Sequence, residues 1–220
     1  MTHQTSSNGP ADAQIGLPAL PSAATLKHLF TAGYIALMAW EIWSRTITDW
    51  VVGGPLEPPA LVVSLVEHWT GYELRFSVAT FLHYVVGIVG YPLAYYYISR
   101  GLRNWSLILD VLVLGIFTLF LGWRIAKYGF EPGNALFWLV VALFTASRFI
   151  NPSALWRDSL SWGSFTWYNA LGIMAPLAGL PFLLLDAAPL LSFMSWVGHI
   201  LFGFLVAFVF EKLEAKSAGS

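Results

Sequence analysis

The chain contains several apolar runs that are about as long as a membrane is thick. A transmembrane helix needs about 20 predominantly apolar residues, because a helix rises about 1.5 Å per residue and the hydrocarbon core of a bilayer is about 30 Å thick. Such a run folds as a helix, since lipid offers no hydrogen-bond partners to an unpaired backbone. The sequence therefore predicts an all-α integral membrane bundle of about six transmembrane helices, at residues 26–47, 74–99, 105–127, 135–150, 169–185 and 190–210.

The scarcity of charge is the second constraint on the fold. Only 10% of the 220 residues are charged and 57% are hydrophobic, whereas soluble domains carry about 25% charged residues. Most of the exterior must therefore face lipid. The predicted partners are the bilayer and either other membrane proteins or further copies of this chain. The net charge of −1 argues against a nucleic-acid partner, and the lack of cysteine excludes disulfides and thiolate-bound metals.

Two segments between the predicted spans are expected to lie at the membrane interface. Ala60 to Trp69 is apolar but too short to span, and Ser153 to Tyr168 places tryptophans among serines. Both patterns are typical of interfacial helices. The predicted fifth helix contains Pro176 and Pro181, so we expect it to be bent or discontinuous.

The distribution of Lys and Arg predicts the orientation of the chain. With six spans both ends lie on one side, which would carry seven of these residues: Lys27, Arg100, Arg103, Arg148, Arg157, Lys212 and Lys216. The other side would carry four: Arg45, Arg75, Arg124 and Lys127. Because cytoplasmic loops carry an excess of positive residues, we predict a multi-pass protein of the inner (plasma) membrane with both termini in the cytoplasm.

The polar ends of the chain define its domain organisation. Residues 1–24 are rich in Ser, Ala and Pro and are predicted to form a disordered cytoplasmic tail. Residues 25–212 would form a single transmembrane domain with a weak two-half repeat, 25–100 and 101–212, and residues 213–220 a C-terminal tail.

Two predicted helices each carry one histidine on a face of otherwise small residues. Ala79, His83 and Gly87 recur at helical spacing in one, and Ser195, His199 and Gly203 recur in the other, at an offset of 116 positions. The two helices would run in the same direction, with the histidines at nearly equal depth. We therefore predict a shared site formed by His83, His199, Gly87 and Gly203. The alternative is that each histidine hydrogen-bonds a neighbouring helix and the glycines serve packing alone.

Two carboxylates also fall within predicted spans. Glu41 has Arg45 one helical turn away, which predicts an ion pair on the same helix face. Asp110 has no cationic residue three or four positions away, so its predicted partner lies on another helix. With the histidines, both carboxylates could instead line a path for protons or cations.

Three short motifs resemble an uncharacterised class of small bacterial polytopic membrane proteins. They are Leu56-Glu57-Pro58-Pro59-Ala60, the run from Leu82 to Gly90 (LHYVVGIVG), and Gly198-His199-Ile200-Leu201-Phe202-Gly203. Members of that class carry a His-x-x-x-Gly helix in each half and have no assigned activity. The resemblance implies a two-half helical fold and nothing about function.

No catalytic motif identifies an enzyme: the sequence lacks a Gly-x-Ser-x-Gly elbow and a phosphate-binding glycine loop. Three functions remain open. The first is a non-catalytic accessory or structural subunit that packs against other membrane proteins, which the small polar inventory favours. The second is an electron-transfer component that binds haem b or a quinone at His83 and His199; the identity of any metal is unknown. The third is a small transporter with a polar site near the membrane midplane.

Overall fold

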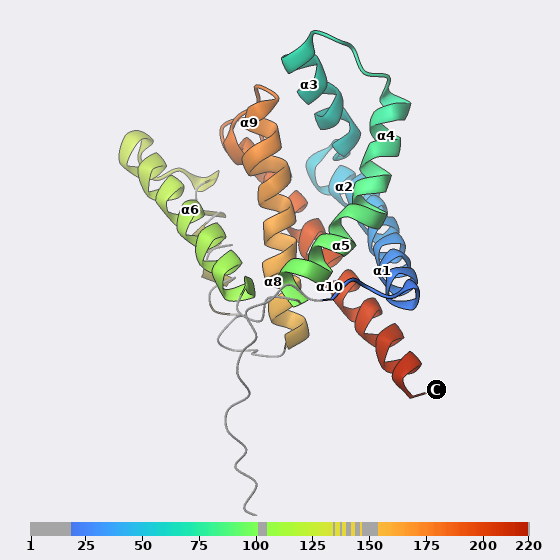
Figure 1. Ribbon diagram of the computed structural model, residues 1–220. Coiled ribbons are helices and arrows are strands. Elements are labelled where there is room, and N and C mark those ends of the chain that lie inside the picture. The colour runs from blue at the N-terminus through green and yellow to red at the C-terminus, as the bar shows by residue number, and fades with distance from the viewer. Residues whose placement is uncertain are drawn as a thin grey trace, which may run out of the picture.

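The computed structural model of the chain describes residues 19–100, 105–133, seven residues between 135 and 146 (135–136, 138–139, 142–143 and 146) and 154–219. The structure is 85% helix, with no strand among the described residues, which confirms the prediction of an all-α fold. The helices pack as a bundle, from which α6 stands off to one side (Figure 1). The predicted N-terminal tail lies mostly outside the described residues.

The chain begins with a long, continuous helix built from α1 (Ala23–Ile42), the π-helical turn η1 (Trp43–Ile47) and α2 (Thr48–Val52). Ser22 caps its start, because its side chain accepts a hydrogen bond from the Thr25 N–H. Gly53, in the left-handed region with φ 80°, ends it.

The short apolar segment that follows forms α3 (Pro58–Thr70). Prolines at its start are compatible with a helix, since the first N–H groups have no partner within the helix. Its 13 residues rise only about 20 Å, which is less than the thickness of the hydrocarbon core.

The next helix runs through α4 (Phe76–Val85), η2 (Val86–Gly90), α5 (Tyr91–Tyr95) and η3 (Tyr96–Arg100). Pro92 has no N–H to offer the Ile88 carbonyl. The ladder adjusts by a π-helical turn, in which the Tyr91 N–H bonds the Val86 carbonyl five residues back. The freed Ile88 carbonyl lies against α1, where a Cβ on Gly33 would come within 2.5 Å of it.

The second half of the chain corrects two predicted boundaries. After α6 (Trp105–Tyr128), one continuous helix runs through α8 (Ala154–Trp167), η4 (Tyr168–Met174) and α9 (Ala175–Leu177). The predicted interfacial segment at 153–168 is therefore wrong, because these residues form the first part of that helix. The predicted fifth helix at 169–185 is also wrong at both ends: the helix ends at Leu177, before Gly179, which has φ 78°, and Pro181.

The serines of α8 explain the error. They suggest a water-facing surface, but Ser159, Ser161, Ser164 and Thr166 are all buried. Several hydroxyls bond carbonyls of their own helix: Ser159 Oγ donates to Leu155 O at 2.5 Å, and Ser161 Oγ to Arg157 O at 2.8 Å. A hydroxyl satisfied within its own helix can face a dry interior.

The last helix, α10 (Pro189–Ala218), follows a tight connection that contains η5 (Phe182–Leu184). It crosses α8 at two glycines. A Cβ on Gly203 would lie 2.7 Å from Ser159 O, and one on Gly163 would lie 2.5 Å from His199 O. The residues predicted as a C-terminal tail continue α10 as far as Ala218.

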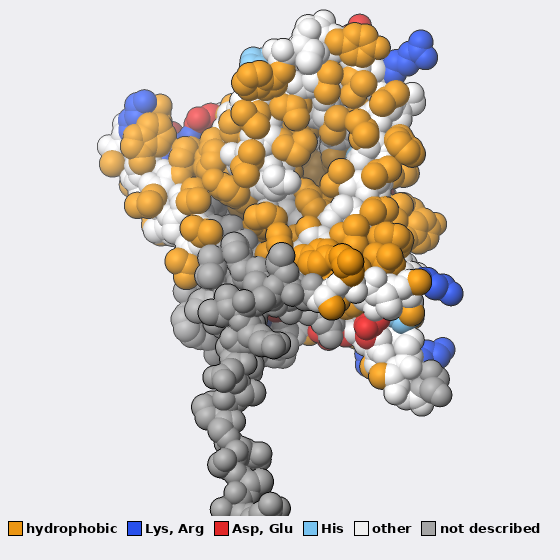
Figure 2. Space-filling view, in the orientation of Figure 1, with side chains coloured by type: hydrophobic (Ala, Val, Ile, Leu, Met, Phe, Trp, Pro, Cys, Tyr) orange, Lys and Arg blue, Asp and Glu red, His pale blue; other side chains and the backbone are white. Residues whose placement is uncertain are grey.

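The core lies where α1, α5, α8 and α10 meet, and it includes the buried side chains of Trp40, Tyr95, Trp162 and Phe210. Two helices of the described part are long and apolar enough to cross a membrane, Phe76–Ile98 and Pro189–Ala218. Apolar side chains cover most of the visible exterior, with Lys and Arg at its upper and lower margins (Figure 2).

Candidate ligand-binding site

A cavity of about 420 Å³ lies between α1, α3, α4, η2, η4 and α10. On one face of the molecule a hollow is visible between α3 and α9 (Figure 2). The walls are mainly apolar, and both π-helical turns that precede a proline, η2 and η4, contribute to them. Cavities of this size and character hold small organic ligands in other proteins.

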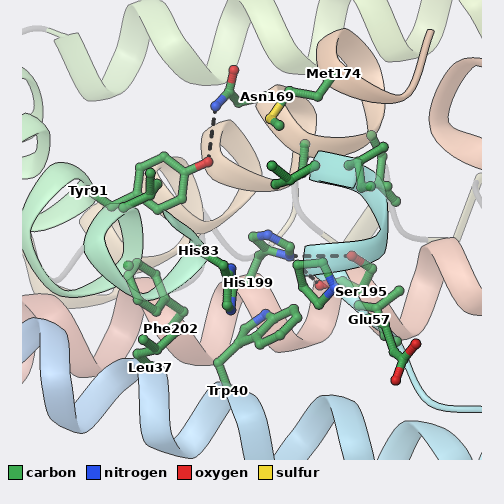
Figure 3. Close-up of a pocket in the computed structure, with 18 of the residues that line it drawn as sticks. Leu37, Trp40, Glu57, His83, Tyr91, Asn169, Met174, Ser195, His199 and Phe202 are labelled. Carbon is green, nitrogen blue, oxygen red and sulfur yellow. Dashed lines mark hydrogen bonds between the residues drawn. The ribbon is translucent and has the colours of Figure 1, made fainter. Parts of the chain in front are cut away.

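His83 of α4 lines the cavity as one of two imidazoles (Figure 3). Its Nε2–H donates to Glu41 Oε1 at 2.8 Å, and Arg45 Nε donates to the other oxygen, Glu41 Oε2, at 2.6 Å. Glu41 is 8% exposed. A buried carboxylate is stable only when paired, so α1 holds Glu41 by Arg45 and uses it to orient a histidine of another helix.

His199 of α10 is the second imidazole and is 9% exposed. Its Nδ1 lies 2.7 Å from Ser195 O, one turn back along the same helix. A carbonyl oxygen can only accept a hydrogen bond, so Nδ1 carries the proton and the ring is fixed by its own helix.

Trp40 of α1 contacts both imidazoles. Its ring centroid lies 5.6 Å from that of His83 and 5.6 Å from that of His199. The two imidazole centroids are therefore no more than about 11 Å apart, twice 5.6 Å. The structure thus brings His83 and His199 to one cavity, above the indole ring (Figure 3).

The two glycines of the predicted site have different surroundings. Gly87 lines the cavity, and a Cβ there would meet only a flexible side chain, Leu37 Cδ1 at 2.8 Å. Gly203 does not line the cavity, because it faces the backbone of α8 at Ser159 and Gly163. Its assignment to the site is corrected: its role is to let two helices cross closely.

The two carboxylates of the predicted spans differ in how they relate to the site. Glu41 belongs to the site through His83, a contact across 42 positions that the sequence did not indicate. Asp110 falls in α6, and its side chain lies outside the described residues.

The cavity wall also contains a polar pair, Asn169 and Tyr91, that the sequence did not predict. Asn169 Nδ2 donates to the Tyr91 hydroxyl at 3.0 Å, which joins η4 to α5 (Figure 3). An asparagine in an apolar run was the only signal available. It did not identify a partner 78 positions away.

The donor set does not match a metal centre of protein ligands alone. The described residues contain no group of three or more His, Asp or Glu side chains that could hold an ion. Among the described residues that line the cavity there is no Lys or Arg, so none of them would pair with the propionates of a haem.

Comparisons with protein-family models, with curated proteins and with solved structures found no match. The resemblance to small bacterial membrane proteins therefore stays a hypothesis that rests on its three motifs.

Proposed function

We propose that the chain is a multi-pass membrane protein that binds a quinone-class ligand, a flat six-membered ring with two oxygen substituents that is aromatic in its reduced form, in the cavity between His83 and His199. The observation that carries the proposal is the pair of imidazoles, each held by its own hydrogen bond, that face one apolar cavity beside Trp40.

The exterior supports the membrane part of the proposal. Besides the two apolar helices of sufficient length, large apolar side chains of α4 and η2 are exposed, including Phe81, Val85 and Val86. A soluble monomer rarely exposes a continuous apolar surface of this kind. Lipid would cover it. The six-span arrangement and the location in the inner membrane belong to this proposal.

The lining supports a ligand with an aromatic ring and few polar atoms. Leu37, Leu82 and Phe202 present apolar surface, while the imidazoles can hydrogen-bond ring oxygens. Trp40 offers a flat surface on which an aromatic ring can pack.

The same lining favours a quinone over haem b. Haem carries two carboxylates, for which the lining has no cationic partner, and Glu57 would repel them. A flat macrocycle would need open space beside each histidine, and the space at Gly203 is filled by α8. The accessory-subunit and transporter functions stay predictions, because no specific contact among the described residues supports either of them.

The test is binding to the purified protein in lipid nanodiscs. Anaerobic titration with decylubiquinol, followed by calorimetry, should give saturable binding to one site per chain. His83→Ala and His199→Ala should each weaken it about tenfold or more, since one hydrogen bond to a buried group contributes about 1–3 kcal/mol.

His68→Ala is the matched control, because His68 is exposed and does not line the cavity. Lack of saturable binding by the wild-type chain would refute the proposal. A haem absorption band in the purified protein would favour the other electron-transfer alternative.

A further inference from the structure

We infer that the cavity binds the reduced, hydroxyl-bearing form of its ligand more tightly than the oxidised, dicarbonyl form, because both histidines present hydrogen-bond acceptors. This inference rests on the proposed function and specifies the ligand class for the same site: a quinol rather than a quinone.

The acceptor on His199 is Nε2. In a neutral imidazole one nitrogen donates and the other accepts, and Nδ1–H is already committed to Ser195 O at 2.7 Å. No described residue hydrogen-bonds Nε2 of His199, so its lone pair is available to a ligand.

The acceptor on His83 is Nδ1, by a parallel argument. Its Nε2 lies 2.8 Å from Glu41 Oε1, and Arg45 at 2.6 Å from the other oxygen stabilises the carboxylate as an acceptor. Nε2 therefore carries the proton. Among the described residues nothing hydrogen-bonds Nδ1, so Glu41 acts as a positioning residue that sets which form of the imidazole faces the ligand.

These two lone pairs discriminate between redox forms. A quinol hydroxyl can donate a hydrogen bond to either nitrogen. A quinone carbonyl oxygen cannot, because it would place its own lone pair against the lone pair of the nitrogen. A site that leaves buried polar groups unpaired with the wrong ligand rejects that ligand.

The other polar groups of the lining do not reverse this preference. The hydroxyls of Ser195 and Tyr91 can rotate to donate or accept. Asn169 uses one N–H of its Nδ2 on Tyr91, which leaves a second N–H and the carbonyl oxygen, so it can serve either form. The indole N–H of Trp40 is buried close to Gly198, where an added Cβ would lie 3.2 Å from Nε1, so it offers the ligand no donor.

The experiment compares the two forms of one probe on the full chain in nanodiscs. Anaerobic titration should give a Kd for decylubiquinol about tenfold or more below that for decylubiquinone. Equivalently, the midpoint potential of the bound couple should lie above that of the free couple by about 30 mV for each tenfold difference in Kd, because the couple transfers two electrons.

Glu41→Gln tests the origin of the preference. A glutamine can accept from Nε2–H or donate to Nε2, so it no longer selects one form of His83. The preference should fall by about tenfold. Glu214→Gln is the matched control: Glu214 also bonds a histidine, with His28 Nδ1 at 2.6 Å, but that pair does not line the cavity.

The outcomes separate the inference from the function beneath it. If neither form binds, both are refuted. Equal affinities, or tighter binding of the quinone, would refute the inference and leave the proposed function standing. A preference that Glu41→Gln retains would refute the role of Glu41. Should that variant not fold, nitrogen-15 shifts of the histidines in the wild-type chain decide: Nδ1 of His83 and Nε2 of His199 must be the unprotonated nitrogens.

Discussion

At the residue scale, Glu41 and His83 depend on one another. Glu41 is buried and its two oxygens are each held by one donor, from His83 and from Arg45. Arg45 reaches solvent with 41% of its side chain exposed, whereas His83 has only 15% exposed. The Arg45 end of this group therefore lies at the surface and the His83 end lies at the cavity.

We predict that His83→Ala destabilises the fold by about 1–3 kcal/mol even without ligand. The change leaves Glu41 Oε1 buried without its donor, and an unpaired buried acceptor carries that cost. Thermal unfolding in detergent should show a lower Tm for His83→Ala than for the wild type.

The exposed His68 provides the comparison. His68→Ala should shift the Tm little, as surface substitutions do. Equal shifts for the two variants would show that the Glu41–His83 contact contributes nothing to stability.

At the element scale, glycines decide how closely pairs of helices approach. Gly163 of α8 and Gly203 of α10 both face backbone atoms of the partner helix, and Gly33 of α1 faces the Ile88 carbonyl. In the membrane setting proposed above, lipid would provide no hydrophobic force between helices, so close backbone packing of this kind would hold them together.

Gly163→Ala is predicted to destabilise the bundle by several kcal/mol. Its Cβ would lie 2.5 Å from His199 O, and backbone atoms cannot move aside as a side chain can. Gly122→Ala in α6 is the matched control, since no atom lies within 4 Å of its added Cβ. That change should be neutral or stabilising by up to about 1 kcal/mol, from helix propensity. Chemical unfolding in detergent measures both, and similar losses would contradict the close crossing.

Gly87 and Gly203 should respond differently to the same substitution. Gly87→Leu places a side chain in the cavity, and the nearest atoms to its Cβ belong to the Leu37 side chain and not to backbone, so ligand binding should be lost from a folded protein. Gly203→Leu pushes α8 away from α10, so folded protein itself should be lost. Size-exclusion profiles and decylubiquinol titration distinguish the two results. Retained binding in Gly87→Leu would place the ligand elsewhere.

At the scale of the whole molecule, both ends of the bundle are tied by charged side chains. His28 near the start of α1 lies 2.6 Å from Glu214 near the end of α10, so these two segments are at the same end of the protein. Arg124 pairs with Asp186 in another such cluster, which joins α6 to the connection before α10. Between these ends the exterior is mainly apolar (Figure 2).

We predict that α3 does not cross the membrane. Single cysteines at the exposed positions Ala60 and Thr70 should both be labelled by an impermeant thiol reagent from one side, here predicted to be the outer one. The chain has no cysteine of its own, so each label reports one position. Labelling from opposite sides would make α3 a span and separate the termini.

Features that depend on neighbours along the chain could be predicted without a structure. The all-α class, the ends of α2 and α3 at Gly53 and Gly71, and the Glu41–Arg45 pair at one-turn spacing are all local. Only the tertiary structure decided that Gly203 faces α8, that the serines of α8 are buried, and that His83 bonds Glu41. The physical reason is that an apolar helix in lipid has no face marked by solvent. Which residues meet is therefore decided by packing between helices that are far apart in sequence.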